Sequence, residues 1–391
     1  MKNSKNKKKT PEKNLKYVAI AIVMVVLVSV LLFQFFPKYF KQTDPIRETS
    51  KPAEEKPEEI PVRKISVKGI EAAEKIGLFL ETMESQDSYY WIKECSGQKT
   101  DNTQVQMNYW ALMAYTGLYD STNNEQYRQN VFSNWEKISK DDTGASIFLS
   151  HQLISFNKKF RSHLDGENKA ILDNKIEEMG YDLASGIYEP GPADKAMIKS
   201  ILARNAYLSL ELSGKKTKSI LDKADQLLNS AVQDNQAQDV LFSEKNIHED
   251  DCWIKLAQLQ KYRITNDETI LANVRNYFDM VNFNEISKTI LLDNSIPMNI
   301  LSCSEALIEL NEITGDKKYL DDSKEILKAY LVNNWDMQEN KICNSDYAVT
   351  SRRNSPNLKE DQLSKTFSEN AYLIYLLTNE KIRHNTFEWS Q

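Results

Sequence analysis

Histidine and the short motifs of several enzyme classes are scarce in this 391-residue sequence. The four histidines, at positions 151, 163, 248 and 384, have separations that match no zinc-binding pattern. The sequence also lacks an H-E-x-x-H motif, a G-x-S-x-G motif, a Walker phosphate loop, a dinucleotide-binding glycine pattern and an EF-hand loop. These absences speak against zinc proteases, serine hydrolases and nucleotide-dependent enzymes, and no cofactor or metal is indicated.

Signals for β-strands are nearly absent, because valine, isoleucine and threonine show little sustained alternation with polar residues. Hydrophobic residues make up 41% of the chain and charged residues 27%, which is ordinary for a globular protein. The sequence therefore predicts an all-α fold.

Excess positive charge occurs only at the N-terminus, where residues 1–16 contain seven lysines and one glutamate. The whole chain has a net charge of −6 and this tail has +6, so the remainder carries −12. A nucleic-acid-binding domain needs clustered lysine and arginine. The main part of the chain is therefore not expected to bind nucleic acid.

An apolar run follows the basic tail. Residues 17–36 contain only Ser29 and Gln34 as polar residues, and a 20-residue helix is long enough to cross a hydrocarbon core of roughly 30 Å. A cleaved signal peptide is the alternative, but the run is longer than usual and no small-x-small cleavage site follows. We predict a single-pass anchor in the cell membrane, with residues 1–16 in the cytoplasm and the main domain outside, because lysine marks the cytoplasmic side.

Residues 37–64 contain five of the ten prolines among charged residues, a composition that favours an extended, disordered linker. The main domain is expected at 65–391.

A spacing of apolar residues repeats within this domain. Ile270, Leu271, Val274, Tyr277, Phe278 and Val281 lie on one stripe of a helix, and the same offsets recur from Ile220 and from Tyr319. The repeats are 50 and 49 residues apart, which indicates an array of helix pairs that is stacked or ring-shaped.

The periodicity predicts twelve helices in six hairpins. Helices with an apolar stripe are expected near 68–84, 125–139, 167–183, 217–232, 268–282 and 317–332. More uniformly apolar helices are expected near 104–119, 146–161, 194–212, 250–264, 297–313 and 365–379. Long connections join each helix of the first set to the next of the second, so in a ring they would gather on one face, where function usually lies.

The segment Leu307 to Leu320, LIELNEITGDKKYL, resembles the helix–TGD–YL–helix signature of the six-hairpin glycosidases, which are (α/α)6 toroids. Counterparts occur at 110–127 and 253–271. The resemblance implies an (α/α)6 toroid of six helical hairpins. It leaves the activity open, because the superfamily includes glycoside hydrolases, sugar epimerases, unsaturated-uronyl hydrolases and polysaccharide lyases.

Two adjacent carboxylates are the first candidates for catalysis, because glycoside hydrolysis requires a pair of them. Asp250 and Asp251, just before Trp253, are similar to the vicinal aspartates of bacterial α-1,6-mannanases, and the resemblance implies acid and nucleophile roles. The alternative is that they cap a helix N-terminus. Further candidates on the connections are Asp142, Glu189 and Asp346, each of which could instead be a turn or cap residue.

Aromatic residues near the same face could stack on sugar rings, although large aromatics near helix ends also fill cores. The substrate-binding candidates are Tyr90, Trp91, Trp110, Tyr188, Trp253 and Trp335. Arg352 could bind an anionic substrate or could be a solvated charge.

The four cysteines allow three pairings, which the sequence does not distinguish. In a closed toroid the connections that carry Cys95 and Cys343 become neighbours, so we predict a disulfide between them that fastens the ring. Cys252 and Cys303 begin consecutive inner helices, and helix axes about 8–10 Å apart favour free buried thiols for that pair.

Together these features predict a membrane-anchored, extracytoplasmic protein that acts on or binds a surface polysaccharide, by glycoside hydrolase-like chemistry. A non-catalytic glycan-binding or scaffold protein with the same fold is the alternative.

Overall fold

The computed structural model describes residues 64–90, 92–94, 103–104, 106–140, 149–184, 196–215, 217–236, 250–283, 297–334 and 364–390. The chain divides into two compact units, Met1–Pro61 and Val62–Gln391, and all of these residues belong to the second. None of the helices in these ranges is long and apolar enough to cross a membrane. The predicted anchor at 17–36 and the linker up to residue 63 lie outside the described residues.

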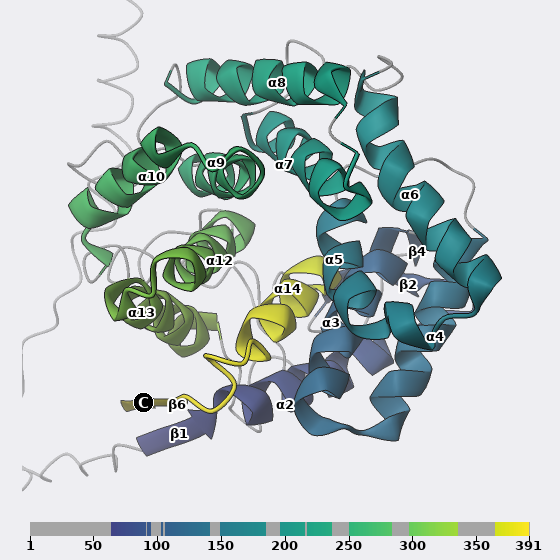
Figure 1. Cartoon of the computed structure of the whole chain (residues 1–391). Coiled ribbons are helices and arrows are strands. Elements are labelled where there is room, and N and C mark those ends of the chain that lie inside the picture. The colour runs from purple at the N-terminus through teal and green to yellow at the C-terminus, as the bar shows by residue number, and fades with distance from the viewer. Residues whose placement is uncertain are drawn as a thin grey trace, which may run out of the picture. The chain divides into compact units, whose positions relative to one another are not determined.

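The second unit is a ring of helices, as predicted (Figure 1). The inner helices are α3 (Gln106–Thr122), α5 (Leu149–Phe160), α7 (Ala196–Ser213), α9 (Asp251–Thr265), α12 (Pro297–Thr314) and α14 (Phe367–Leu377). The outer helices are α2 (Gly69–Thr82), α4 (Glu125–Ser139), α6 (Gly166–Ala184), α8 (Lys218–Gln236), α10 (Glu268–Met280) and α13 (Lys317–Asn334). All twelve lie within a few residues of their predicted positions, so the mainly helical fold is confirmed.

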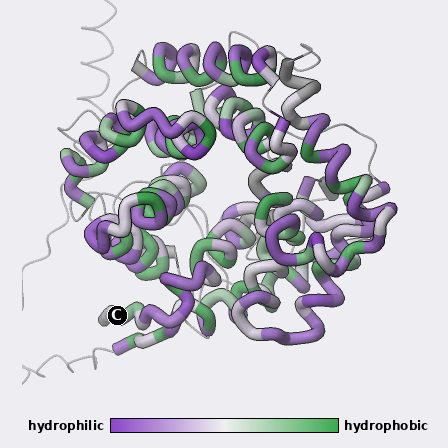
Figure 2. The backbone as a smooth tube through the Cα atoms, in the orientation of Figure 1, coloured by the Kyte–Doolittle hydropathy of each residue, from purple (hydrophilic) through white to green (hydrophobic). Residues whose placement is uncertain are grey.

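Burial explains the two kinds of apolar pattern. Every residue from 199 to 210 of α7 is buried, because this inner helix is covered on all sides. The outer helix α10 buries only Leu271, Val274 and Phe278, which form one stripe toward the inner ring. Along the outer helix α8, hydrophilic and hydrophobic residues alternate with the helical turn (Figure 2).

Four of the hairpin turns begin with a residue in the left-handed backbone conformation. Asn123, Gly214, Asn266 and Gly315 each have a positive φ, between 54° and 72°, directly after an inner helix. A left-handed residue at this position ends a helix, and asparagine or glycine adopts it with little strain. Asn124, Asp267 and Asp316 then accept a backbone N–H from the outer helix two residues later. These local signals explain why the hairpins could be located from the sequence.

The two ends of the domain close the ring. Each inner helix packs against the next, and α14 packs against both α3 and α2. Strand β1 (Lys64–Lys68) pairs antiparallel with β6 (Thr386–Ser390), with Ile65 opposite Trp389 and Val67 opposite Phe387 (Figure 1). A Cβ atom at Gly69 would lie 2.9 Å from the carbonyl oxygen of Ile382, so the absence of a side chain lets α2 approach this turn. The sixth hairpin is therefore built from both ends of the domain.

Three small sheets depart from the all-α prediction. Besides β1–β6, β2 (Tyr89–Tyr90) pairs with β4 (Thr103–Gln104), and β3 (Ile92–Glu94) pairs with β5 (Ser364–Thr366). Strands of two or three residues are too short to give a recognisable alternation, which is why they were missed. The β3–β5 pair joins the segments that precede the first and last inner helices, so these two connections are neighbours, as ring closure requires.

The prediction of free thiols at Cys252 and Cys303 is wrong. The two residues form a disulfide, with their Cα atoms 4.8 Å apart. They occupy the first turn of α9 and the second turn of α12. Because Cα atoms lie about 2.3 Å from a helix axis, helices whose axes are about 8–10 Å apart can bring two facing Cα atoms within disulfide range, so the axis distance did not exclude the bond. Cys95 and Cys343 lie outside the described residues, so their disulfide stays a prediction.

Candidate functional site

The ring has two ends, which are distinguished by the kind of connection that lies there. We call the end at which the inner helices begin the loop end, since the long connections enter there. The opposite end, at which the inner helices stop and the short hairpin turns lie, is the turn end. Asp250 and Asp251 lie at the loop end, whereas a pocket lined by described residues lies at the turn end.

Asp250 contacts the neighbouring inner helix. Its side chain lies directly before α9, is 1% exposed, and its Oδ2 accepts the backbone N–H of Met197 at 3.0 Å. Met197 is the second residue of α7, where backbone N–H groups have no partner within the helix. A carboxylate at this place is favoured by the hydrogen bond and by the helix dipole. Asp250 therefore caps α7.

Asp251 contacts the outer ring. Its Oδ1 accepts the amide of Asn235 on α8 at 2.7 Å, and its Oδ2 accepts the hydroxyl of Tyr277 on α10 at 3.1 Å. The ammonium of Lys255 lies 4.7 Å from the centroid of the Tyr277 ring. Burial lowers the pKa of Lys255, and the carboxylate of Asp251 partly opposes this effect.

The vicinal carboxylates thus have separate sets of partners, although they are adjacent in sequence. The Asp250 side chain makes no cap hydrogen bond to α9, the helix that follows it, and caps the neighbouring α7 instead. The contacts of Asp251 support a structural role for that residue. The catalytic role that the resemblance implies for them stays a prediction.

Trp110 and Trp253 lie inside the ring. Their side chains are nearly buried, at 4% and 5% exposed, and both pack on Tyr372 of α14 with ring centroids about 6 Å apart: 5.8 Å and 6.1 Å. The indole N–H of Trp253 donates to Asn299 Oδ1 at 2.7 Å. Tyr90 is half-buried against the same core. Trp110, Trp253 and Tyr90 therefore pack as core residues among the described residues. Core packing was the alternative to the prediction that they stack on sugar rings.

The other candidates lie outside the described residues. They are the acids Asp142, Glu189 and Asp346, the aromatics Trp91, Tyr188 and Trp335, and Arg352. Within the described ranges, no group of three or more His, Cys, Asp or Glu side chains could hold a metal ion.

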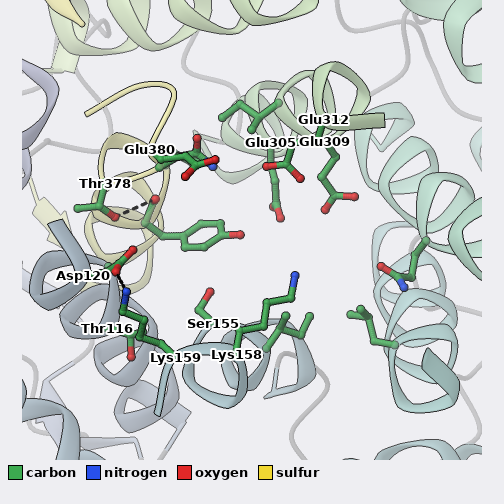
Figure 3. A pocket seen from close by; sticks show the side chains of 18 of the residues that line it. Thr116, Asp120, Ser155, Lys158, Lys159, Glu305, Glu309, Glu312, Thr378 and Glu380 are labelled. Carbon is green, nitrogen blue, oxygen red and sulfur yellow. Dashed lines mark hydrogen bonds and ion pairs between the residues drawn. The ribbon is translucent and has the colours of Figure 1, made fainter. Parts of the chain in front are cut away.

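A pocket of about 320 Å³ opens at the turn end, and all six inner helices or the turns after them contribute to its wall. Glu305, Glu309 and Glu312 extend toward it from α12, and Ser155 and Lys158 extend toward it from α5 on the opposite side (Figure 3). Asp120 and Lys159 form an ion pair at its side. The lining includes six carboxylates and four cationic side chains, which are Asp120, Glu211, Glu305, Glu309, Glu312 and Glu380, and Lys158, Lys159, Arg204 and Arg263.

A buried ionic network forms the deep wall of this pocket. Arg204 Nη2 donates to Glu305 Oε1 at 2.8 Å and to Glu309, and the Arg204 and Glu305 side chains are 4% and 3% exposed. The hydroxyl of Tyr372 donates to the other oxygen of Glu305. Burial lowers the pKa of Arg204, but the carboxylates of Glu305 and Glu309 outweigh this effect and raise it, so the guanidinium stays charged.

Tyr372 separates the two ends of the ring. Its ring packs on the indoles of Trp110 and Trp253 toward the loop end, and its hydroxyl donates to Glu305 in the wall of the turn-end pocket. Burial raises the pKa of Tyr372 well above its usual value, so its hydroxyl keeps the proton that it donates. The turn-end pocket is therefore separated from the loop end by a packed layer.

The carboxylates of this network were missed among the sequence candidates. Glu305, Glu309 and Glu312 are spaced by four and three residues, so they share one face of a helix whose other residues are uncharged. Charged residues on a buried helix are rarely left unpaired, and this spacing was the available signal.

No protein-family model and no curated protein sequence matches the chain. Solved structures do match. An unsaturated glucuronyl hydrolase specific for heparin superposes with a TM-score of 0.56 and 9% identity, over 79% of this chain and 95% of the other. A sugar epimerase from a ruminal bacterium gives 0.52 and 12%, over 80% and 99%. An inactive α-1,6-mannanase of Salegentibacter sp., in complex with α-1,6-mannotetrose, gives 0.52 and 12%, over 81% and 99%.

These similarities show that the domain has the six-hairpin fold, which confirms the resemblance predicted from the sequence at the level of the fold.

Proposed function

We propose that the chain is an extracytoplasmic carbohydrate-active protein that acts on a surface polysaccharide with glycoside hydrolase-like chemistry. The observation that carries this proposal is the closed ring of six hairpins, which superposes over about four fifths of the chain on a glucuronyl hydrolase, a sugar epimerase and a mannanase: 79%, 80% and 81%. The mannanase holds an α-1,6-mannotetrose, so another protein with this fold binds an oligosaccharide, which supports the proposal.

The proposed catalytic groups are Asp250 and Asp251, with Asp142, Glu189 and Asp346 as partners from other connections. The inactive mannanase carries alanine in place of two consecutive aspartates, which supports a role for a vicinal pair in that enzyme. One carboxyl group would protonate the leaving oxygen, and another would attack the sugar or activate water. For either role, Asp250 or Asp251 would have to exchange a present hydrogen bond for one with the substrate.

A non-catalytic glycan-binding function is the second candidate, and one observation favours it. Oδ2 of Asp250 and both carboxylate oxygens of Asp251 already accept hydrogen bonds from Met197, Asn235 and Tyr277. A carboxylate held in this way is suited to support helix ends, and sugar binding would then require no paired acids.

Hydrolysis separates the two candidates. The full-length chain in lipid nanodiscs is incubated with a panel of polysaccharides that includes α-1,6-mannan, and new reducing ends are measured. We expect cleavage of one polymer and a loss of about 10²- to 10⁴-fold in Asp250→Asn or Asp251→Asn, because asparagine can still accept a hydrogen bond but cannot transfer a proton.

Asp316→Asn is the matched control, since Asp316 caps an outer helix at the turn end and should leave hydrolysis unchanged. Retention of a glycan without cleavage, or equal cleavage by all three variants, would contradict the catalytic proposal. The first of these results would favour the glycan-binding alternative.

We further propose that residues 17–36 anchor the chain in the cell membrane and place the domain outside. The Cys252–Cys303 disulfide supports this location, because disulfides persist in oxidising compartments and are rare in the cytoplasm. Protease added to intact cells is expected to digest the domain at 65–391 and to spare an epitope at the N-terminus. Protection of the domain until the cells are lysed would refute this topology.

A further inference from the structure

The turn-end pocket has features of a ligand site that the proposed function does not use. Arg204 forms part of its wall and is 3% exposed, yet its Nε and Nη1 have no hydrogen-bond partner among the described residues. A buried N–H group without an acceptor destabilises the folded protein, more so when the group is charged. An acceptor from a bound molecule would remove this cost.

The same wall contains acceptors that have no donor. Oε2 of Glu309 has no hydrogen-bond partner in the described region, and the Nη2 atom of Arg263 is 3.8 Å away. The hydroxyl of Thr116, also on the lining, likewise has no partner there. The wall therefore matches a ligand that both donates and accepts hydrogen bonds.

This match selects the class of ligand. A phosphate or carboxylate would only accept, and it would face the carboxylates of Glu305, Glu309 and Glu312. An ammonium group would only donate, and it would face the guanidinium groups of Arg204 and Arg263. A hydroxyl group donates to a carboxylate and accepts from a guanidinium, so a neutral molecule with several hydroxyl groups matches both.

The size and the apolar part of the wall agree with this class. A volume of about 320 Å³ lies at the lower end of the range of small-molecule pockets, about 300–1,000 Å³. Tyr375, Leu208 and Ile308 also line the pocket, and the half-buried Tyr375 ring is stacked on Tyr372 at 6.4 Å. An aromatic ring of this kind provides an apolar surface for the C–H face of a pyranose.

The rim of the pocket lies at the turn end. Lys158, Glu211 and Glu380 line the pocket and are exposed, so the rim faces solvent. The packed layer at Tyr372 separates the pocket from Asp250 and Asp251.

We propose that the turn-end pocket is a second binding site, distinct from the loop end, for a neutral saccharide of one or two rings. The site goes beyond the proposed function, because it requires no chemistry at Asp250 or Asp251. Arg204, Glu309 and Glu312 bind the hydroxyl groups, and Tyr375 packs against the ring.

Calorimetric titration of the full-length chain in lipid nanodiscs tests this site. The probes are mannose, glucose, galactose, mannobiose and maltose, with glucuronate and spermidine as charged comparisons. We expect saturable binding of at least one neutral sugar and none of the charged probes. Ser155→Trp fills the pocket without removing a charge and should abolish binding. Glu312→Gln should weaken binding by about tenfold, the loss of roughly one charge-assisted hydrogen bond.

Two variants serve as controls. Ser162→Trp adds the same side chain at an exposed site just beyond α5 and should bind like the unmodified chain. Asp251→Asn should also bind normally, which separates this site from the loop end. The proposal is overturned if no neutral sugar binds, if only a charged probe binds, or if Ser155→Trp binds as well as Ser162→Trp. It is also overturned if Asp251→Asn loses binding and Ser155→Trp retains it.

Discussion

Replacing Arg204 by methionine is expected to lower the free energy of unfolding by about 3–5 kcal/mol. Arg204 is the buried cation that pairs with both Glu305 and Glu309, whose side chains are 3% and 14% exposed. Without it, the buried carboxylate of Glu305 would have no compensating charge among its described ion pairs, and Glu309 would keep only the longer ion pair with Arg263, at 3.8 Å. Urea-induced unfolding of the full-length chain in lipid nanodiscs, followed by tryptophan fluorescence, measures the loss.

Two comparisons isolate the cause. Arg128→Met removes an exposed pair with Glu125, whose side chains are 38% and 61% exposed, and should cost no more than about 1 kcal/mol. Adding Glu305→Gln and Glu309→Gln to Arg204→Met should restore most of the lost stability, because the uncompensated charges are then gone. If Arg204→Met and Arg128→Met were equally mild, the buried network would have no role in holding α7 to α12.

Replacing Cys252 and Cys303 by serine is expected to lower the free energy of unfolding by about 4 kcal/mol, from the chain-entropy model for the 51-residue loop that the disulfide closes. The bond ties the start of α9 to α12 at the loop end, so the unfolded chain has more freedom to gain when the bond is absent. Unfolding midpoints in urea of the oxidised protein and of the double variant measure the difference.

The single variants provide the control. Cys252→Ser and Cys303→Ser each break the same bond, so either should cost nearly as much as both together, whereas independent side chains would add. Additive single effects, or no loss in the double variant, would contradict the disulfide. A Cys252–Cys303 peptide pair should also be found by mass spectrometry of a digest prepared without reductant.

The fold could be predicted from the sequence to a large extent, because its signals are local. The apolar stripes of α8, α10 and α13 share one spacing, and Gly214, Asn266 and Gly315 end the inner helices before them. Helix propensity, a left-handed residue and an N-cap act within a few residues of each other. The short strand β1 was missed, although Ile65 and Val67 alternate with exposed residues, because five residues carry too little pattern.

The candidate site could be predicted from the sequence less well than the fold, because its contacts join residues that are distant in the chain. Asp250 caps a helix 53 residues earlier in the chain, and Arg204 meets Glu305 across 101 residues. Asp250 and Asp251 were predicted to be catalytic because they are adjacent in sequence, but their carboxylates contact different helices. Glu305, Glu309 and Glu312 were overlooked because they are distributed along a largely buried helix rather than clustered in a connection.

The amino-acid sequence by itself determined that the domain is a set of helical hairpins of about fifty residues and where each hairpin turns, since residues close in the chain decide both. The tertiary structure alone decided which carboxylates reach the turn-end pocket, which cap a neighbouring helix, and that Cys252 meets Cys303. The physical reason is that an inner helix such as α7 is buried on all sides. It therefore has no amphipathic stripe to indicate its rotation, and that rotation is set only when its neighbours pack around it.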